Sequence, residues 1–387
     1  MLPTSVEENV KITVICVDCL REDAVGPQMA EFLSNSVHFT NAYAAGPATH
    51  PSVPTCLTGK VTGEHGVIET HYKPRVKSWV EDLADIGFQT TCFTANHFTY
   101  SIAGMFNEWK MLPWLDPRSK TKKTQDSYEK VWRYISKYDG DLFTYVHLMD
   151  VHPPYRLHGL TNEEFGMSVD KFDLVRAINM AAVSRKDLLS DEQWKKIVWL
   201  MTKEVGYLDD RIDFPGDIVF FMSDHGEILG EYYRGARWWS HSAKHWSDHQ
   251  LRIPFGYSIQ GEAPRKVWQP FCTRFLGDLI KALLDKGEYP SGGELYWEDY
   301  WYNTSHYCVK NPLRPEESLV VGSDGIRWYN GEDVDLANVP GHMVDLLADR
   351  MAAHGYRGGL WASEPEVATG EDKEIVEDRL RALGYID

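Results

Sequence analysis

The sequence lacks three features that would place the protein in a membrane or outside the cell. No apolar run reaches the roughly 18 residues of a membrane-spanning helix. The first residues have neither the basic start nor the apolar stretch of a secretory signal peptide. The six cysteines are too sparse for a disulfide scaffold, and several lie in apolar runs where cysteine acts as a small hydrophobic residue. We therefore expect a cytoplasmic protein with no membrane span.

Positive charge is also scarce, because 40 Lys and Arg stand against 57 Asp and Glu, giving a net charge of −17. Such a surface repels a phosphate backbone, so nucleic acid is disfavoured as a general partner. A small anionic substrate can still bind, since a bound divalent cation would reverse the sign locally. The composition is otherwise that of an ordinary globular protein, and its 387 residues allow one large domain and a smaller one. A homo-oligomer is possible.

Apolar, strand-like segments along the chain are followed by polar side chains. The predicted strands are residues 11–17, 88–94, 141–147 and 216–223, and the predicted helices between them are 124–138, 168–184 and 191–212. The alternation predicts an α/β fold with a doubly wound, mostly parallel sheet flanked by helices. In such sheets ligands bind at the carboxyl ends of the strands. Asp18, Asn96, His147 and Asp224 stand at those four ends.

The pattern changes after about residue 255. A helix near 267–286 is followed by short strands over 318–329 and by a helix at 371–383. These features predict a catalytic core over residues 1–255 and a smaller α+β subdomain over residues 256–387.

A possible metal site follows the last of the four strands, where Asp224, His225, Gly226 and Glu227 are consecutive. A carboxylate and an imidazole on one tight turn can share a divalent metal ion. Asp18 would supply a further ligand from the first strand. The alternative is that Asp224 caps a helix and His225 has no role.

The segment around Thr49 resembles the nucleophile segment of the sulfatase and alkaline phosphatase superfamily. Sulfatases carry C/S-x-P-x-R before a Thr-Gly pair, and counting back from Thr58 and Gly59 places Thr49 at the nucleophile and Val53 at the arginine. Threonine cannot be converted to formylglycine, so the resemblance implies phosphoryl rather than sulfuryl transfer. A register that begins at Ser52 is rejected, because it lies too close to Thr58 and ends in cysteine.

The turn at Asp224 likewise resembles the superfamily signature S-D-H-G-E-x-L-G-E. Sulfatases bind calcium with two consecutive aspartates where this chain has Asp18 and Cys19. The missing carboxylate favours zinc or manganese over calcium, with Thr49 as a fourth ligand beside Asp18, Asp224 and His225. Cys19 is either a soft ligand or, as we expect, a buried bystander.

Residues 145–155 resemble the H-F-x-D-x-H-x-P-Y segment of sulfatases and a similar segment of phosphoethanolamine transferases. Those transferases use a threonine followed by Ser-Val-Pro, as this chain does. The resemblance implies that His147, His152 and a third histidine surround the phosphate or bind a second metal. His241 is the first candidate for the third, and His245 the second. Alternatively, His152 contacts substrate or acts as a base with only one metal bound, or Asp150 is a second-site ligand.

Two further residues are candidate substrate contacts by resemblance, which extends from residue 11 to the C-terminus. Asn96 would stabilise the equatorial oxygens of the transferred group, although a turn asparagine is an equal alternative. Lys244, with His245 beside it, falls one residue from the spacing of a substrate-contacting lysine in sulfatases.

Together these residues predict a hydrolase with one or two divalent metal ions, zinc or manganese being favoured over calcium. The substrate is expected to be a small anionic phosphoester: a phosphodiester, a phosphonate monoester or a phosphomonoester. Thr49 would form a phosphothreonine intermediate, and water would be the acceptor. The alternatives are a sulfatase that works without formylglycine and a non-catalytic binding protein that kept the fold.

Overall fold

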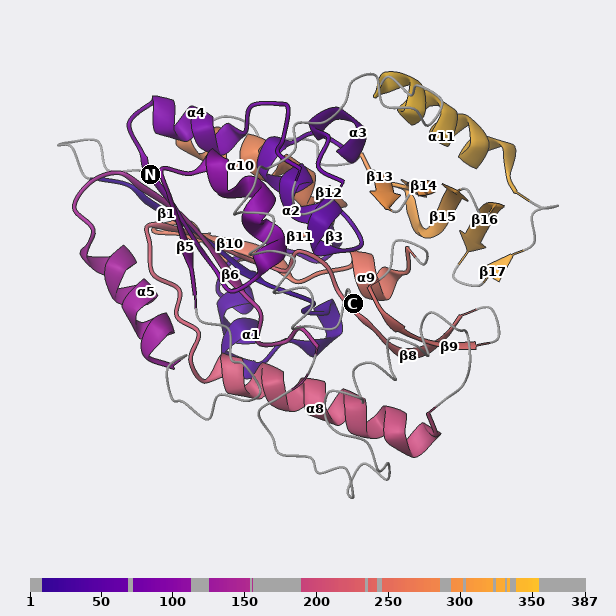
Figure 1. Cartoon of the computed structure of the whole chain (residues 1–387), viewed down its shortest axis with the longest axis horizontal. Coiled ribbons are helices and arrows are strands. Elements are labelled where there is room, and N and C mark those ends of the chain that lie inside the picture. Colours follow the sequence, from indigo (N-terminus) through magenta and orange to yellow (C-terminus); the bar gives the residue numbers. More distant parts are fainter. Residues whose placement is uncertain are drawn as a thin grey trace.

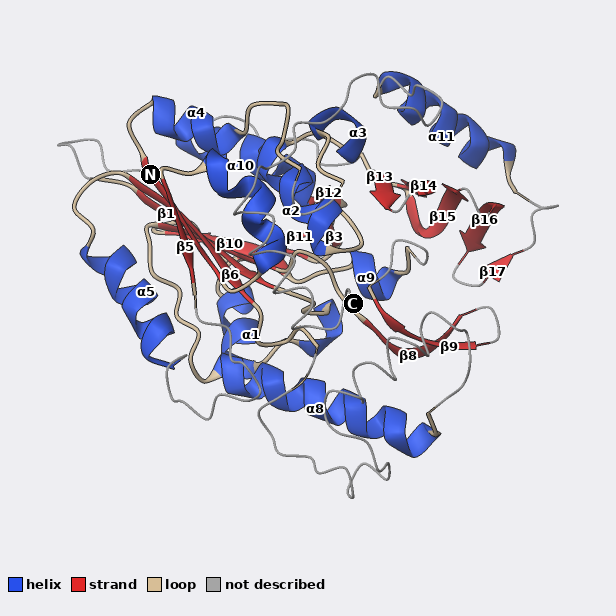
Figure 2. Cartoon of the chain, viewed as in Figure 1, coloured by secondary structure: helices blue, strands red, loops and turns tan. Residues whose placement is uncertain are grey.

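The computed structural model describes residues 9–68, 72–112, 125–153, 155, 189–233, 236–241, 246–285, 294–301, 304–322, 325–330, 333–334 and 339–354. A large sheet lies between two layers of helices, and a smaller sheet with its own helix lies to one side (Figures 1 and 2). Among these residues no helix is long and apolar enough to cross a membrane.

The large sheet consists of β1 (Lys11–Val17), β2 (Val37–Phe39), β4 (Gln89–Thr94), β5 (Glu108–Met111), β6 (Leu142–Leu148), β7 (Ile218–Met222), β10 (Phe255–Ile259) and β11 (Arg265–Val267). The small sheet contains β13 (Tyr296–Trp301), β14 (Thr304–Asn311), β15 (Arg314–Gly322), β16 (Gly325–Asn330) and β17 (Asp333–Val334). Two strand pairs complete the β structure: β3 (Ala42–Tyr43) with β12 (Phe271–Cys272), and β8 (Ile228–Tyr233) with β9 (Ala236–Ser240).

The α-helices are α1 (Pro27–Ser34), α2 (Thr49–Thr58), α3 (Thr62–His65), α4 (Trp79–Asp85), α5 (Gln125–Lys137), α8 (Asp191–Asp209), α9 (Asp248–Leu251), α10 (Leu276–Asp285) and α11 (Gly341–Ala353). The 3-10 helices are η1 (Glu22–Ala24), η2 (His97–Met105) and η3 (Thr273–Phe275).

The large sheet confirms the predicted mostly parallel topology. Its strand order is β11-β2-β10-β7-β1-β6-β4-β5, and only β10 runs antiparallel to its neighbours. Cys16 near the end of β1 pairs with His147 on one side and Met222 on the other. This register brings the carboxyl ends of β1, β6 and β7 to one edge of the sheet, as expected for a ligand site in an α/β fold.

Alternate residues of β1 enter two different cores, which explains its continuous apolar sequence. Ile12, Val14 and Cys16 pack in the core that includes residues of α2, α4 and α10. Ile15 and Val17 pack in the opposite core with residues of α1, α5 and α8. The sheet is therefore covered on both faces, as predicted for a doubly wound fold (Figure 2).

The C-terminal part of the prediction needs correction. Strands β10 and β11 follow residue 255 but belong to the large sheet, and the separate small sheet begins only at Tyr296. The helix expected near 267–286 begins at Leu276, because Phe271 and Cys272 pair with Ala42 and Tyr43 before it. The strands expected over 318–329 are present as β15 and β16. The helices expected at 168–184 and 371–383 lie outside the described residues.

A half-buried charge network joins the end of α11 to the N-terminal part of the chain. The Nδ1 and Nε2 atoms of His354 lie 3.3 Å from Glu64 Oε2 and 3.1 Å from Glu294 Oε1. Burial lowers the pKa of His354, but the two carboxylates outweigh it and raise that pKa to about 9. Burial raises the pKa of Glu294, but His354 and Arg274 bring it down to about 2.

This network predicts a pH-dependent stability. The raised pKa of His354 means that its contribution is complete below its ordinary pKa of 6.5 and is lost as the pH rises through about 9. Glu294 stays ionised over that range. We expect His354→Gln to lower the unfolding free energy by roughly 1–2 kcal/mol at pH 6 and by much less at pH 10. Urea unfolding at both pH values would measure this. His342→Gln is the control, because that α11 histidine also pairs with a carboxylate, Glu317 at 3.0 Å, but its side chain is 55% exposed. A His354→Gln penalty of equal size at both pH values would contradict the linkage.

Candidate active site

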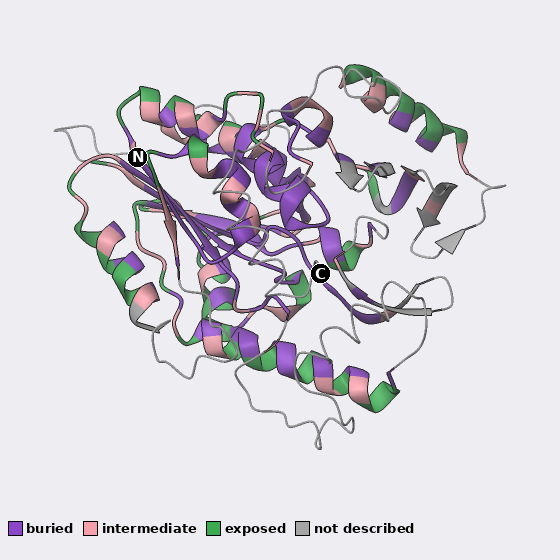
Figure 3. Ribbon diagram, in the orientation of Figure 1, coloured by how far each residue is buried: buried purple, intermediate pink, exposed green. Residues whose placement is uncertain are grey.

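The polar residues at the carboxyl ends of the strands form one buried cluster with the first residue of α2. Asp18, Asn96, His147, Asp224 and His225 have exposed fractions of 0–1%. Thr49, at the start of α2, is 4% exposed. All ten residues of α2 are buried (Figure 3), so the helix places Thr49 in the interior of the molecule.

Local packing fixes the two chain segments that meet here. Ser52 Oγ in α2 donates a hydrogen bond of 2.5 Å to the backbone carbonyl of Asp224. The turn after Asp224 needs a glycine, since a Cβ on Gly226 would lie 2.0 Å from the carbonyl oxygen of His249. The Thr49 helix and the Asp224 turn are therefore held in one arrangement.

The hydroxyl of Thr49 is at the centre of the cluster. Its Oγ1 donates to Asp224 Oδ2 at 2.8 Å and lies 3.4 Å from Asp18 Oδ2. His225 Nε2 is 3.3 Å away, and Asn96 Nδ2 approaches to the same distance. The Asn96 amide also donates to Asp18 Oδ2. The structure thus brings Thr49 together with the three predicted metal ligands and with Asn96.

Asp18, Asp224 and His225 suit a divalent cation. One ligand atom from each lies within 4.8 Å of the others. His225 Nδ1 is 2.7 Å from the carbonyl oxygen of Gly226, so Nδ1 carries the proton and Nε2 presents a lone pair to the cluster. Asp18 Oδ1 is buried and has no hydrogen-bond partner among the described residues. A cation held by these groups would satisfy that oxygen.

Burial and neighbouring charges shift the pKa values of these groups. Burial raises the pKa of Asp18, but His152 and His147 bring it well below its ordinary value. His147 Nε2 is 3.0 Å from Asp18 Oδ2, and that bond raises the pKa of His147 against the effect of burial. For Asp224, burial and the charge of Asp18 together raise the pKa. The cluster therefore contains two buried carboxylates that repel each other.

The other two predicted histidines form an adjacent pair. His152 Nδ1 bonds to the carbonyl of Pro153, and His152 Nε2 has no partner among the described residues. Burial lowers the pKa of His152 to about 4, so its ring is neutral at neutral pH. The ring centroid of His241 is 5.1 Å away, and His241 Nδ1 is 2.8 Å from Glu227 Oε2. Glu227 and Asp18, in turn, raise the pKa of His241 against the effect of burial.

The remaining predicted residues have different outcomes. Lys244 and His245 lie outside the described residues. Asp150, the alternative second-site ligand, accepts a hydrogen bond from Tyr128 of α5. Val53, at the arginine position of the sulfatase segment, is buried in the apolar core.

Glu227 was not predicted to belong to the site, and Cys19 was expected to be a buried bystander. The Cys19 thiol lies 3.5 Å from Glu227 Oε2 and 3.6 Å from His241 Nδ1. Burial and the charges of Asp18 and Glu227 raise the pKa of this thiol. The sequence signal for Glu227 was its place directly after Asp224, His225 and Gly226, but its partner His241 comes from beyond a hairpin.

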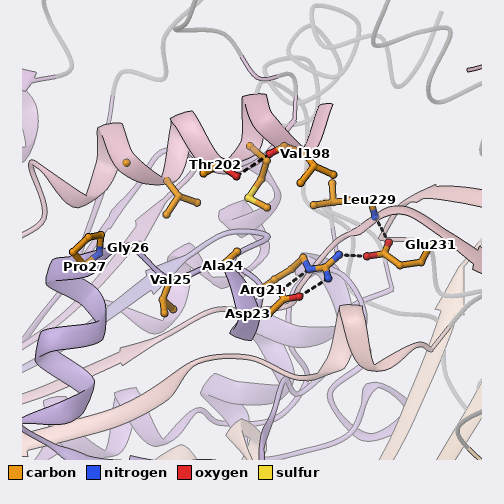
Figure 4. Close-up of a pocket in the computed structure, with 13 residues that line it drawn as sticks. Arg21, Asp23, Ala24, Val25, Gly26, Pro27, Val198, Thr202, Leu229 and Glu231 are labelled. Carbon is orange, nitrogen blue, oxygen red and sulfur yellow. Dashed lines mark hydrogen bonds and ion pairs between the residues drawn. The ribbon is translucent and has the colours of Figure 1, made fainter. Parts of the chain in front are cut away.

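Arg21 holds the backbone of the turn at Glu227 in place. Its guanidinium pairs with Asp23 and Glu231, and its Nη1 donates to the backbone carbonyl of Glu227 at 3.2 Å. These three side chains line a separate cavity of about 440 Å³ between the η1 region and α8 (Figure 4). None of the residues that contact Thr49 lines this cavity.

Comparisons with known proteins identify a family and a shared fold. The family model described as Sulfatase matches residues 21–271. No curated protein sequence matched the chain. A solved structure described as a 2-O GAG sulfatase is 15% identical, covers 93% of this chain and 95% of its own, and has a TM-score of 0.69. A putative sulfatase from Bacteroides thetaiotaomicron is also 15% identical, with the same coverage and a TM-score of 0.68. The phosphonate monoester hydrolase of Agrobacterium radiobacter is 15% identical over 97% of this chain and 96% of its own, with a TM-score of 0.56. At these identities the structures show a shared fold.

Proposed function

This chain belongs to the sulfatase family, and from that premise we propose that it is a metal-dependent phosphoester hydrolase that works through a phosphothreonine intermediate. The observation that carries the proposal is the position of Thr49. Its hydroxyl, not a convertible cysteine or serine, lies 2.8 Å from Asp224 and 3.3 Å from both His225 and Asn96. The structural similarity to a phosphonate monoester hydrolase is consistent with phosphorus chemistry.

The first step is attack by Thr49. Asp18, Asp224 and His225 would hold a divalent cation, which when bound lowers the pKa of the Thr49 hydroxyl. The bond from Thr49 Oγ1 to phosphorus forms while the bond from phosphorus to the leaving oxygen breaks. The hydroxyl proton is released to solvent, because Asp224 Oδ2, its hydrogen-bond acceptor, would be a ligand of the cation, and the leaving oxygen takes a proton from solvent. The Asn96 amide is placed to donate to an equatorial oxygen of the transferred group.

The second step is hydrolysis of the phosphothreonine. Neutral His152 has an unpartnered Nε2, and a ring nitrogen of His152 lies within 4.8 Å of a carboxylate oxygen of Asp18. It acts as the base that takes a proton from the attacking water. The bond from water oxygen to phosphorus forms, the bond to Thr49 breaks, and the Thr49 oxygen takes up the proton that His152 received from water.

Sulfate ester hydrolysis is the second candidate, because the family and two similar structures are described as sulfatases. Two features of the chain argue against it. Thr49 cannot become formylglycine, and the buried apolar Val53 replaces the arginine of the sulfatase segment. A purely non-catalytic role is disfavoured by the complete set of buried polar groups around Thr49.

A matched substrate panel tests the proposal. Metal-stripped protein would be reloaded with zinc, manganese or calcium and assayed on nitrophenyl phosphate, bis-nitrophenyl phosphate, a phosphonate monoester and nitrophenyl sulfate. We expect turnover of at least one phosphorus ester that exceeds sulfate turnover and is restored by zinc or manganese better than by calcium. Faster hydrolysis of the sulfate ester with every metal would overturn the proposal in favour of a sulfatase.

A further inference from the structure

A second group of metal-ligating side chains lies beside the Asp18, Asp224 and His225 cluster, and the Cys19 thiol belongs to it. The thiol is 3.5 Å from Glu227 Oε2 and 3.6 Å from His241 Nδ1, while the latter two atoms are 2.8 Å apart. Cys19 has a φ of +60°, which is uncommon for a residue other than glycine. The backbone is thus held in a left-handed conformation while the sulfur lies beside these two groups.

The group contains a buried carboxylate that is only partly satisfied, since Glu227 Oε2 pairs with His241 Nδ1. Glu227 is fully buried, and its Oε1 has no hydrogen-bond partner in the described part of the chain. Arg21 is close, but its side chain pairs with Asp23 and Glu231 and reaches only the backbone carbonyl of Glu227. A buried carboxylate oxygen without a partner is costly, and a metal ion is one of the few groups that would satisfy it.

The distances from sulfur and the donor types fit zinc. In a tetrahedral zinc site, sulfur lies about 3.5 Å from the neighbouring nitrogen or oxygen ligands, given the usual bond lengths. The two distances from Cys19 Sγ match that separation. Glu227 Oε2 and His241 Nδ1 are 2.8 Å apart in a direct hydrogen bond, and zinc would replace that bond and separate the two atoms to about 3.3 Å. His225 belongs to the first cluster instead, since its Nδ1 is engaged by the Gly226 carbonyl and its Nε2 is 3.3 Å from Thr49 Oγ1.

We propose that Cys19, Glu227 and His241 form a second, thiolate-containing zinc site next to the first cluster. A thiolate favours zinc over the hard cations calcium, magnesium and manganese. Three protein ligands leave a fourth position for water or a substrate oxygen, as in catalytic zinc sites. The use of this position in phosphoester hydrolysis rests on the proposed function, whereas the binding of zinc does not.

Cobalt spectroscopy tests the site without any assay of activity. Metal-stripped full-length protein would be loaded with cobalt(II) and desalted, and its metal content and absorption spectrum would be recorded. We expect about two cations per chain and a near-ultraviolet charge-transfer band from thiolate to cobalt. Cys19→Ser should lose the band and retain about one cation, while Glu227→Gln should weaken binding at the second site at least about 10-fold.

Cys16→Ala is the matched control, because that buried thiol lies near His147 and Asp224 of the first cluster. It should keep the band. Loss of the band in Cys16→Ala but not in Cys19→Ser, or a wild-type spectrum without the band, would overturn the proposal. The wild-type spectrum provides a test even if Cys19→Ser fails to fold. A band without any phosphoester turnover would refute the proposed function alone, and Thr49-dependent turnover without the band would refute the second site alone.

Discussion

Replacing Thr49 with alanine should lower kcat/KM for phosphoester hydrolysis by at least about 10³-fold, which corresponds to several kcal/mol of transition-state stabilisation. The variant removes the oxygen that would bond to phosphorus, and water would have to take its place without the positioning that α2 provides. The fold should tolerate the change. Ser52 still ties α2 to the Asp224 turn, and the removed side chain is small.

The measurement is steady-state hydrolysis of the best phosphorus ester, combined with acid quenching and mass spectrometry of the peptide that contains Thr49. Wild-type protein should show a phosphorylated peptide, and Thr49→Ser should retain part of the activity because it keeps a hydroxyl. Thr55→Ala is the matched control. That buried α2 threonine directs its hydroxyl to His65 at 3.0 Å and not to the cluster. Undiminished turnover in Thr49→Ala would end the assignment of the nucleophile.

The sequence predicted those residues of the site that stand at the ends of strands. Asp18 follows β1 and His147 lies on β6, and their meeting follows from the parallel pairing of Cys16 with His147. His147 Nε2 accordingly reaches Asp18 at 3.0 Å. Periodicity and polar strand ends suffice for such a prediction, because neighbouring parallel strands share one carboxyl edge.

The part that the sequence did not predict depends on turns and on pairing between distant segments. The proximity of His152, in the turn after β6, to His241 was expected only from the family resemblance and not from periodicity or strand ends. Cys19 lies beside Glu227 with its backbone in a left-handed conformation, which no local pattern signals in a cysteine. Pairing between distant segments also carries the large sheet past residue 256, since β10 returns antiparallel to β7.

Replacing Asp224 with asparagine should stabilise the metal-free protein while it abolishes catalysis. Burial and the neighbouring Asp18 raise the pKa of Asp224, so its ionised form is unfavourable when no cation is bound. An asparagine of the same shape can still accept the backbone N–H of His225, which is 2.9 Å from Asp224 Oδ1, and its amide can donate to Thr49. We expect the metal-free variant to gain about 1–3 kcal/mol of unfolding free energy at pH 8. The gain should shrink as the pH falls, because protonation of Asp224 then relieves the same repulsion in the wild type.

Bound zinc should make the wild type more stable than Asp224→Asn. The wild-type melting temperature should rise with zinc concentration, as for any ligand that binds only the folded state, whereas Asp224→Asn should respond weakly and lose at least about 10³-fold in kcat/KM. Asp209→Asn is the matched control, since that buried carboxylate accepts the backbone N–H groups of Gln28 and Met29 outside the cluster. It should destabilise the protein with and without zinc. A metal-free Asp224→Asn protein that melts below the wild type at pH 8 would show that Asp18 and Asp224 do not repel each other enough to need a cation. The electrostatic argument for a bound cation beside Thr49 would then be wrong.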